Sequence, residues 1–158
     1  MIAHMDDPNP PLGPPLDPPV GFEPLFRTSP FLETVGPFFY RKVQDGDQDG
    51  SFVVGLRVLP KHANGRGAAH GGLLMTLLDI ALGYRASLSE TPPANLTTAS
   101  LTADFAGGAK VGDWVEAHVD VQRVGGRLAF ACAFLMVNGE RVVRGSAVFA
   151  RGASRPEG

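Results

Sequence analysis

The longest apolar stretch of the chain runs from Gly71 to Ala86 and has no clear polar face. Its only charged side chains are Asp79 and Arg85. A helix that is hydrophobic on all sides is buried in a protein core. Because the stretch is shorter than the roughly 20 apolar residues that span a bilayer, it predicts the buried central helix of a soluble domain.

Around this helix, apolar residues recur at every second position, which is the spacing of β-strands. Strands are predicted at residues 36–43, 51–59, 94–105, 114–124, 128–137 and 141–151. The 114–124 segment alternates apolar and polar side chains, as a half-exposed strand does, whereas the 128–137 segment is apolar on both faces. In the 94–105 segment, one face is expected to carry the polar side chains Thr98, Ser100, Thr102 and Asp104.

The order of these elements indicates an α+β fold with one antiparallel sheet wrapped around one long central helix. A short helix is expected within residues 22–34, ahead of the first strands. The DGDQDG run at residues 45–50 predicts a hairpin turn; as a calcium loop it would need a Glu at the twelfth position, where Leu56 stands. A single sheet has a second face and two edges, which predicts burial against another subunit.

The distribution of prolines along the chain predicts where the folded domain begins. Eight of the fourteen prolines lie in residues 1–24, and proline disfavours both helices and sheets. Residues 1–21 are therefore expected to form a flexible Pro-rich arm, residues 22–151 a single domain, and residues 152–158 a flexible tail.

The overall charge and the single cysteine narrow the class of protein. A formal net charge of −2 argues against a nucleic-acid partner. Cys132 has no partner for an internal disulfide, and a lone cysteine on an apolar strand is usually core filler. Without a signal sequence or a membrane span, the expected location is the cytoplasm.

Two features of the central helix indicate a functional site. Gly71 and Gly72 open it, so a ligand can approach backbone N–H groups that have no helical partner and lie at the positive end of the helix dipole. Asp79 is a carboxylate in apolar surroundings, which is unfavourable unless the group is paired or functional. Alternatively, the glycines allow close packing, and Asp79 is a structural carboxylate bonded to Thr76 or to a strand residue such as Thr98 or Asn95.

The spacing of Asn64, His70-Gly71-Gly72 and Asp79 resembles that of hotdog-fold acyl-CoA thioesterases of the PaaI-like, phenylacetate-degradation branch. The resemblance implies a dimer of hotdogs, often paired into a homotetramer, that hydrolyses acyl- or aryl-CoA thioesters without a metal or other cofactor. It implies that Asp79 is the nucleophile or general base and that the Gly71 N–H polarises the thioester carbonyl. It also implies that Asn64 orients water or the acid and that Thr98 assists, with Ser100 within the error of the alignment.

Helix geometry adds a constraint to these roles. Eight residues at 1.5 Å rise separate Gly71 from Asp79 by about 12 Å along the helix axis. One thioester carbon must lie about 3 Å from both the attacking group and the oxyanion donor, so one helix cannot supply both. Two antiparallel helices related by a two-fold axis would place Gly71 of one subunit beside Asp79 of the other.

Further candidates have weaker signals. His70 either donates to the carbonyl or caps the helix, and Arg123 and Arg127 either bind the phosphates of CoA or flank a solvated hairpin tip. Phe105, with Leu82 and Tyr84, is a candidate wall of the acyl pocket. No metal-ligand spacing is present. Two other classes of hotdog protein remain open, a non-catalytic acyl-CoA sensor and a dehydratase or hydratase.

Overall fold

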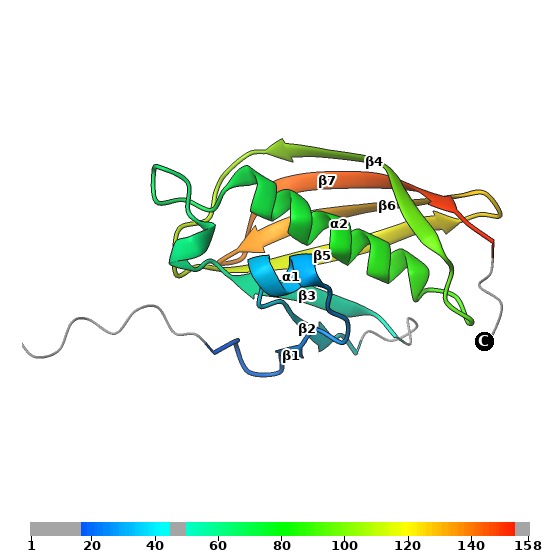
Figure 1. The fold of residues 1–158 in the computed structure, drawn as a ribbon, viewed down its shortest axis with the longest axis horizontal. Coiled ribbons are helices and arrows are strands. Elements are labelled where there is room, and N and C mark those ends of the chain that lie inside the picture. Colours follow the sequence, from blue (N-terminus) through cyan, green and yellow to red (C-terminus); the bar gives the residue numbers. More distant parts are fainter. Residues whose placement is uncertain (1–16, 45–49, 154–158) are drawn as a thin grey trace, which may run out of the picture.

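A computed structural model describes residues 17–44 and 50–153 of the chain. They form a seven-stranded antiparallel sheet, in the order β1-β2-β3-β5-β6-β7-β4, that curves around a long helix, α2 (Figure 1). The elements are β1 (Glu23–Pro24), α1 (Pro30–Val35), β2 (Phe39–Lys42), β3 (Phe52–Arg57), the 3-10 helix η1 (Pro60–His62), α2 (Gly71–Ser87), β4 (Leu96–Phe105), β5 (Trp114–Val124), β6 (Leu128–Val137) and β7 (Glu140–Arg151). The α+β fold predicted from the sequence, one antiparallel sheet wrapped around one central helix, is confirmed.

Helix α2 is the centre of the core, as predicted. It packs against β3, β4, β5, β6 and β7, and the side chains of Leu77, Leu78 and Leu82 are fully buried. Gly145 of β7 makes room for this packing, because a Cβ there would lie 2.8 Å from the terminal carbons of Leu78. Arg85 is also buried, and burial lowers its pKa. None of the described helices is long and apolar enough to cross a membrane.

The second half of the chain follows the predicted boundaries closely, whereas the first half departs from them. β5 and β6 begin and end at the predicted residues. In the segment predicted to contain a short helix, residues 23–24 instead form the edge strand β1, and the helix α1 is limited to Pro30–Val35. The side chain of Ser29 accepts a hydrogen bond from the N–H of Leu32, and Pro30 occupies the first turn, so these two residues determine where α1 begins.

A β-bulge in β4 changes which side chains face the helix. Thr98 pairs with Phe149 of β7, and Ser100 pairs with the adjacent Val148, so Ala99 between them is unpaired. Paired residues point to the same side of a sheet, and Phe149 is buried in the core. The prediction that Thr98 and Ser100 share a face is therefore wrong: Thr98 faces α2, and Ser100 faces away.

Part of each predicted terminal segment lies outside the described residues, namely residues 1–16 and 154–158, and the same holds for residues 45–49 of the predicted turn. The backbone carbonyl of Asp17 accepts a hydrogen bond from the Arg57 side chain at 3.1 Å. The described end of the arm is thus in contact with β3. β2 and β3 pair as an antiparallel hairpin across the predicted turn.

Replacing Gly55 of β3 with alanine is expected to lower the free energy of unfolding by about 1–3 kcal/mol through overpacking. A Cβ at this position would lie 2.4 Å from Cζ2 of Trp114, whose ring packs against those of Phe22 and Phe39. Urea unfolding measures the loss. Gly65→Ala is the control, since a Cβ there meets nothing within 4 Å; equal losses in the two variants would contradict the account.

Candidate active site

Asp79 and Thr98 form the central contact of the candidate site. The hydroxyl of Thr98 donates a hydrogen bond to Oδ1 of Asp79 at 2.7 Å, a contact that the bulge at Ala99 makes possible. The other carboxylate oxygen, Oδ2, accepts no hydrogen bond from any of the described residues. One oxygen of Asp79 is therefore oriented, and the other is available to a water molecule or a substrate.

A cavity of about 480 Å³ contains this pair and is mainly apolar. Its apolar lining comes from α1, α2 and β4 and comprises Phe31, Leu32, Met75, Ile80, Tyr84 and Leu101. The polar members other than Asp79 and Thr98 are Ser29 and Thr76. The Thr76 hydroxyl donates to the backbone carbonyl of Gly72 at 2.9 Å, so of the suggested structural partners it is Thr98 that binds Asp79.

The first residues of α2 present one free backbone donor. The N–H of Gly72 donates to Nδ1 of His70 at 3.1 Å, so His70 caps the helix. The N–H of Gly71 has no acceptor within the described part of the chain. A free N–H at the positive end of a helix dipole is suited to bind an oxyanion.

Asn64 organises the loop that leads into α2. Its Oδ1 accepts hydrogen bonds from the N–H groups of Arg66 at 2.8 Å and Ala68 at 3.3 Å, and the Asn64 N–H donates to the Ala68 carbonyl at 2.7 Å. The side-chain oxygen of Asn64 thus accepts hydrogen bonds within the loop. In the single chain, Asn64 makes no hydrogen bond to Asp79.

A single chain does not bring Gly71 and Asp79 together. Both lie on the continuous helix α2, and eight residues of helix separate them by about 12 Å. Gly71 instead borders Phe105, whose ring lies 3.8 Å from where a Gly71 Cβ would be. The Gly71 N–H and the Asp79 carboxylate of one chain are thus too far apart to act on one carbonyl group.

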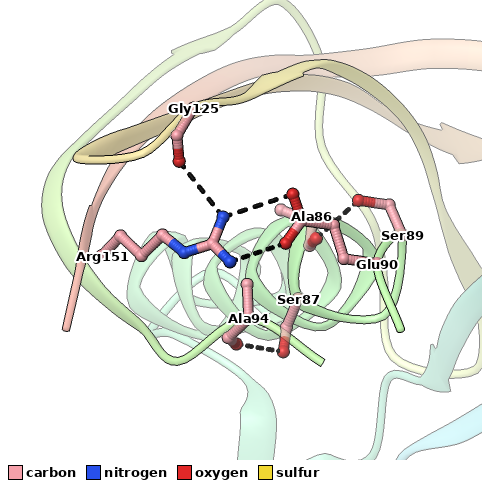
Figure 2. A network of polar contacts seen from close by, with 7 residues as sticks. All are labelled: Ala86, Ser87, Ser89, Glu90, Ala94, Gly125 and Arg151. Carbon is pink, nitrogen blue, oxygen red and sulfur yellow. Dashed lines mark hydrogen bonds and ion pairs between the residues drawn. The ribbon is translucent and has the colours of Figure 1, made fainter. Parts of the chain in front are cut away.

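A second, polar cleft of about 840 Å³ lies at the end of α2 and includes Arg27, Glu90, Asn95 and Arg151 in its lining. Figure 2 shows Arg151 bound to both carboxylate oxygens of Glu90 and to the carbonyl of Gly125. The backbone carbonyl of Arg127 also accepts a hydrogen bond from the Arg151 N–H. The predicted hairpin tip, with Arg123 and Arg127, is therefore attached to the rim of this cleft.

Comparison with known proteins identifies the family. The family model described as "Thioesterase superfamily" matches residues 66–143. A Pseudomonas aeruginosa protein whose name is "putative esterase" is 50% identical over 125 residues, which are 79% of this chain and 90% of that protein. The chain belongs to the thioesterase superfamily.

Solved structures of thioesterase-superfamily proteins share the fold. A mutant of the phenylacetic acid degradation protein PaaI of Thermus thermophilus superposes with a TM-score of 0.65 at 25% identity, over 78% of this chain and 99% of that one. Zebrafish thioesterase superfamily member 2 gives a TM-score of 0.68 at 25% identity, over 78% of this chain and 88% of that one. The predicted membership of the PaaI-like hotdog thioesterases is confirmed.

In this thioesterase-superfamily chain, the residues predicted to contact the substrate do not all lie at the cavity around Asp79. Tyr84 lines the cavity around Asp79, whereas Leu82 is fully buried in the core and is not among the lining residues. Ser100 lies on the opposite face of the sheet from α2. Phe105 is close to Gly71 and outside the lining of the cavity that contains Asp79.

Sequence reasoning missed the contribution of α1 to the cavity. Ser29, Phe31 and Leu32 all line it. The Ser-Pro sequence at residues 29–30 is a recognisable helix start, but nothing in the sequence places that helix beside Asp79. Within the described ranges, no three His, Cys, Asp or Glu side chains cluster in a way that could hold a metal ion.

Proposed function

We propose that this protein hydrolyses acyl- or aryl-CoA thioesters to the free acid and CoA. The observation that carries the proposal is the Asp79 carboxylate, oriented by Thr98 at 2.7 Å in an apolar cavity large enough for an acyl group. Membership of the thioesterase superfamily supports thioester hydrolysis in general. Acyl-CoA as the substrate is our inference.

Asp79 acts on the thioester in one of two ways. As a general base, it takes a proton from a water molecule whose oxygen then attacks the carbonyl carbon. As a nucleophile, its own oxygen attacks that carbon, and water hydrolyses the resulting anhydride. In both cases the carbon–sulfur bond breaks and CoA leaves as a thiol. The free oxygen Oδ2 suits either role, because Thr98 occupies Oδ1.

The Gly71 N–H is proposed to stabilise the negative charge that develops on the carbonyl oxygen. It has no acceptor in the described part of the chain, and such a donor acts most strongly in a site from which water is excluded. His70, which caps the helix through Nδ1, holds this end of α2 in position. Its Nε2 makes no hydrogen bond to the described residues and is proposed as a second donor to the substrate.

Two chains are proposed to complete each site. β4 is an edge strand of ten residues, and no other described strand pairs with its outer side; such an edge favours pairing with another chain. Its residues Thr98 and Leu101 line the cavity around Asp79, so a second copy paired along β4 would lie next to that carboxylate. A two-fold axis there would bring Gly71 of each chain to Asp79 of the other. Assembly of two such dimers into a tetramer and a cytoplasmic location remain predictions.

The polar cleft is proposed to receive the phosphates of CoA. Glu90 already pairs with Arg151, whereas Arg27 makes no ion pair with the described residues and lies over the ring of Tyr84 at 5.8 Å. Tyr84 also lines the cavity around Asp79, so Arg27 lines the cleft and contacts a residue of the cavity. A guanidinium in this position can bind phosphate oxygens while the thioester lies near Asp79.

Arg27→Met is expected to raise KM for acyl-CoA about tenfold, because the substrate loses one hydrogen bond to a charged group. Methionine retains an unbranched stem over Tyr84 but lacks the charge. KM for the matching thioester of N-acetylcysteamine, which has no phosphate, should not change. Arg144→Ala is the control, because Arg144 pairs with Asp104 and is exposed. Equal effects of Arg27→Met on both substrates would contradict this role.

The proposal is tested with a panel of acyl- and aryl-CoA thioesters by measuring the release of free thiol. Hydrolysis of at least one thioester, with one thiol formed per acid, is expected. A non-catalytic acyl-CoA sensor would bind the same compounds without releasing thiol. A dehydratase or hydratase would change the acyl group and leave the thioester bond intact.

A further inference from the structure

We propose that α1 forms a fixed wall of the acyl pocket and that Phe31 is the residue that limits the size of the acyl group. This inference rests on the proposed thioesterase function. It assigns a specificity-determining role to a helix outside the residues matched by the family model, which begin at residue 66.

The cavity around Asp79 has one wall made by α1. Leu32 of this helix is buried in the core and attaches it to the domain. The neighbouring Phe31 is 59% exposed, yet its side chain lines the same cavity as Asp79, Met75 and Leu101. A large apolar ring that is open to solvent and lines the same cavity as the proposed catalytic carboxylate is suited to contact an apolar ligand.

The last turn of α1 is fixed by two side chains from η1. Lys61 Nζ donates to the Thr34 carbonyl at 3.0 Å, and Nε2 of His62 donates to the Val35 carbonyl. These bonds satisfy carbonyls at the end of the helix that have no helical partner. A helix of six residues is not stable on its own, so these contacts help to determine its position.

His62 is suited to be a permanent anchor. Its Nδ1 accepts a hydrogen bond from the Leu59 N–H at 2.9 Å, so Nε2 carries the proton that binds Val35. The ring is buried, and burial lowers its pKa. The neutral form, which makes both hydrogen bonds, is therefore the favoured one.

The segment that precedes α1 is fixed as well. The ring of Phe26 lies 5.1 Å from that of Tyr40, 5.4 Å from that of Phe52 and 5.7 Å from that of Tyr84. Tyr84 itself lines the cavity. Because α1 is held on both sides, a longer acyl group meets the Phe31 ring as a fixed obstacle rather than displacing the helix.

The size of the side chain at position 31 should therefore set which acyl groups bind. Phe31→Ala removes the ring and admits longer or bulkier groups, whereas Phe31→Trp excludes groups that the native protein accepts. Each additional methylene that becomes buried is expected to tighten binding about fourfold. Short acyl groups, which lose a contact in Phe31→Ala, should bind more weakly to that variant.

The test compares the native protein, Phe31→Ala and Phe31→Trp with a series of S-alkyl-CoA thioethers of increasing length, which cannot be hydrolysed. Dissociation constants are measured by calorimetry, and kcat/KM is measured for the matching thioesters. Phe130→Ala is the control, since Phe130 is an exposed aromatic residue that pairs with Val148 on the outer face of the sheet. Melting temperatures establish that each variant is folded.

The expected result is a preferred length that increases in Phe31→Ala, decreases in Phe31→Trp and stays unchanged in Phe130→Ala. An unchanged preference in both Phe31 variants would overturn the inference, even if the thioesters are hydrolysed normally. A shift in thioether binding without thiol release from any thioester would instead support the wall and contradict the proposed thioesterase activity.

Discussion

Asp79→Asn is expected to lower kcat for thioester hydrolysis by about 10²- to 10⁴-fold, the usual contribution of a positioned acid–base group. The amide has nearly the shape of the carboxylate but is neither a useful base nor a nucleophile. Its oxygen can still accept the hydrogen bond that Thr98 donates to Oδ1. The fold should therefore persist, and the loss should appear in kcat at saturating substrate.

A second carboxylate provides the control for this variant. Asp104 lies on β4, pairs with Arg144 at 2.8 Å and is exposed. Asp104→Asn should retain full activity, and both variants should unfold at a temperature close to that of the native protein. Normal turnover by folded Asp79→Asn would remove Asp79 from the mechanism.

Gly71→Pro is expected to lower kcat by about 10²- to 10³-fold, because proline removes the N–H that is proposed to bind the oxyanion. The position tolerates proline well, since it is the first residue of α2. The preceding residue, His70, has φ −61° and ψ 138°, an extended conformation that proline requires of its neighbour. The loss of activity is therefore attributable to the missing N–H donor rather than to disruption of the helix.

Gly71→Ala distinguishes the effect of losing the N–H donor from the effect of adding a side chain. Alanine keeps the N–H, and its Cβ would make an ordinary contact of 3.8 Å with the Phe105 ring. Measured with one saturating thioester, Gly71→Ala should be close to native and Gly71→Pro strongly impaired. Similar kcat values for the two variants would show that the N–H does not contribute to the reaction.

Much of the fold could be predicted from periodicity. The buried stretch from Gly71 onward and the alternating segments after residue 94 have patterns that are long enough to define helix and strands. The first 40 residues could not be assigned in the same way. β1 has only two residues, and α1 depends on tertiary contacts from η1 that no local pattern encodes.

The candidate site was predicted only in part for a similar physical reason. The positions of Gly71 and Asp79 on one helix follow directly from the sequence. Thr98 is one of the partners that the sequence suggests for Asp79, but the contact depends on an unpaired Ala99. A one-residue bulge reverses the faces that simple alternation predicts. The wall made by α1 depends on a contact between segments more than 40 residues apart in the chain.

The central claim is that two chains complete each site, and mixed dimers test it most directly. Asp79→Asn and Gly71→Pro chains, each inactive alone, are unfolded together, refolded, and separated by different affinity tags. A heterodimer then has one site in which both residues are mutated and one in which both are native. Thiol release at about half the native rate per dimer is predicted. Folded heterodimers that remain as inactive as their parents would contradict the claim.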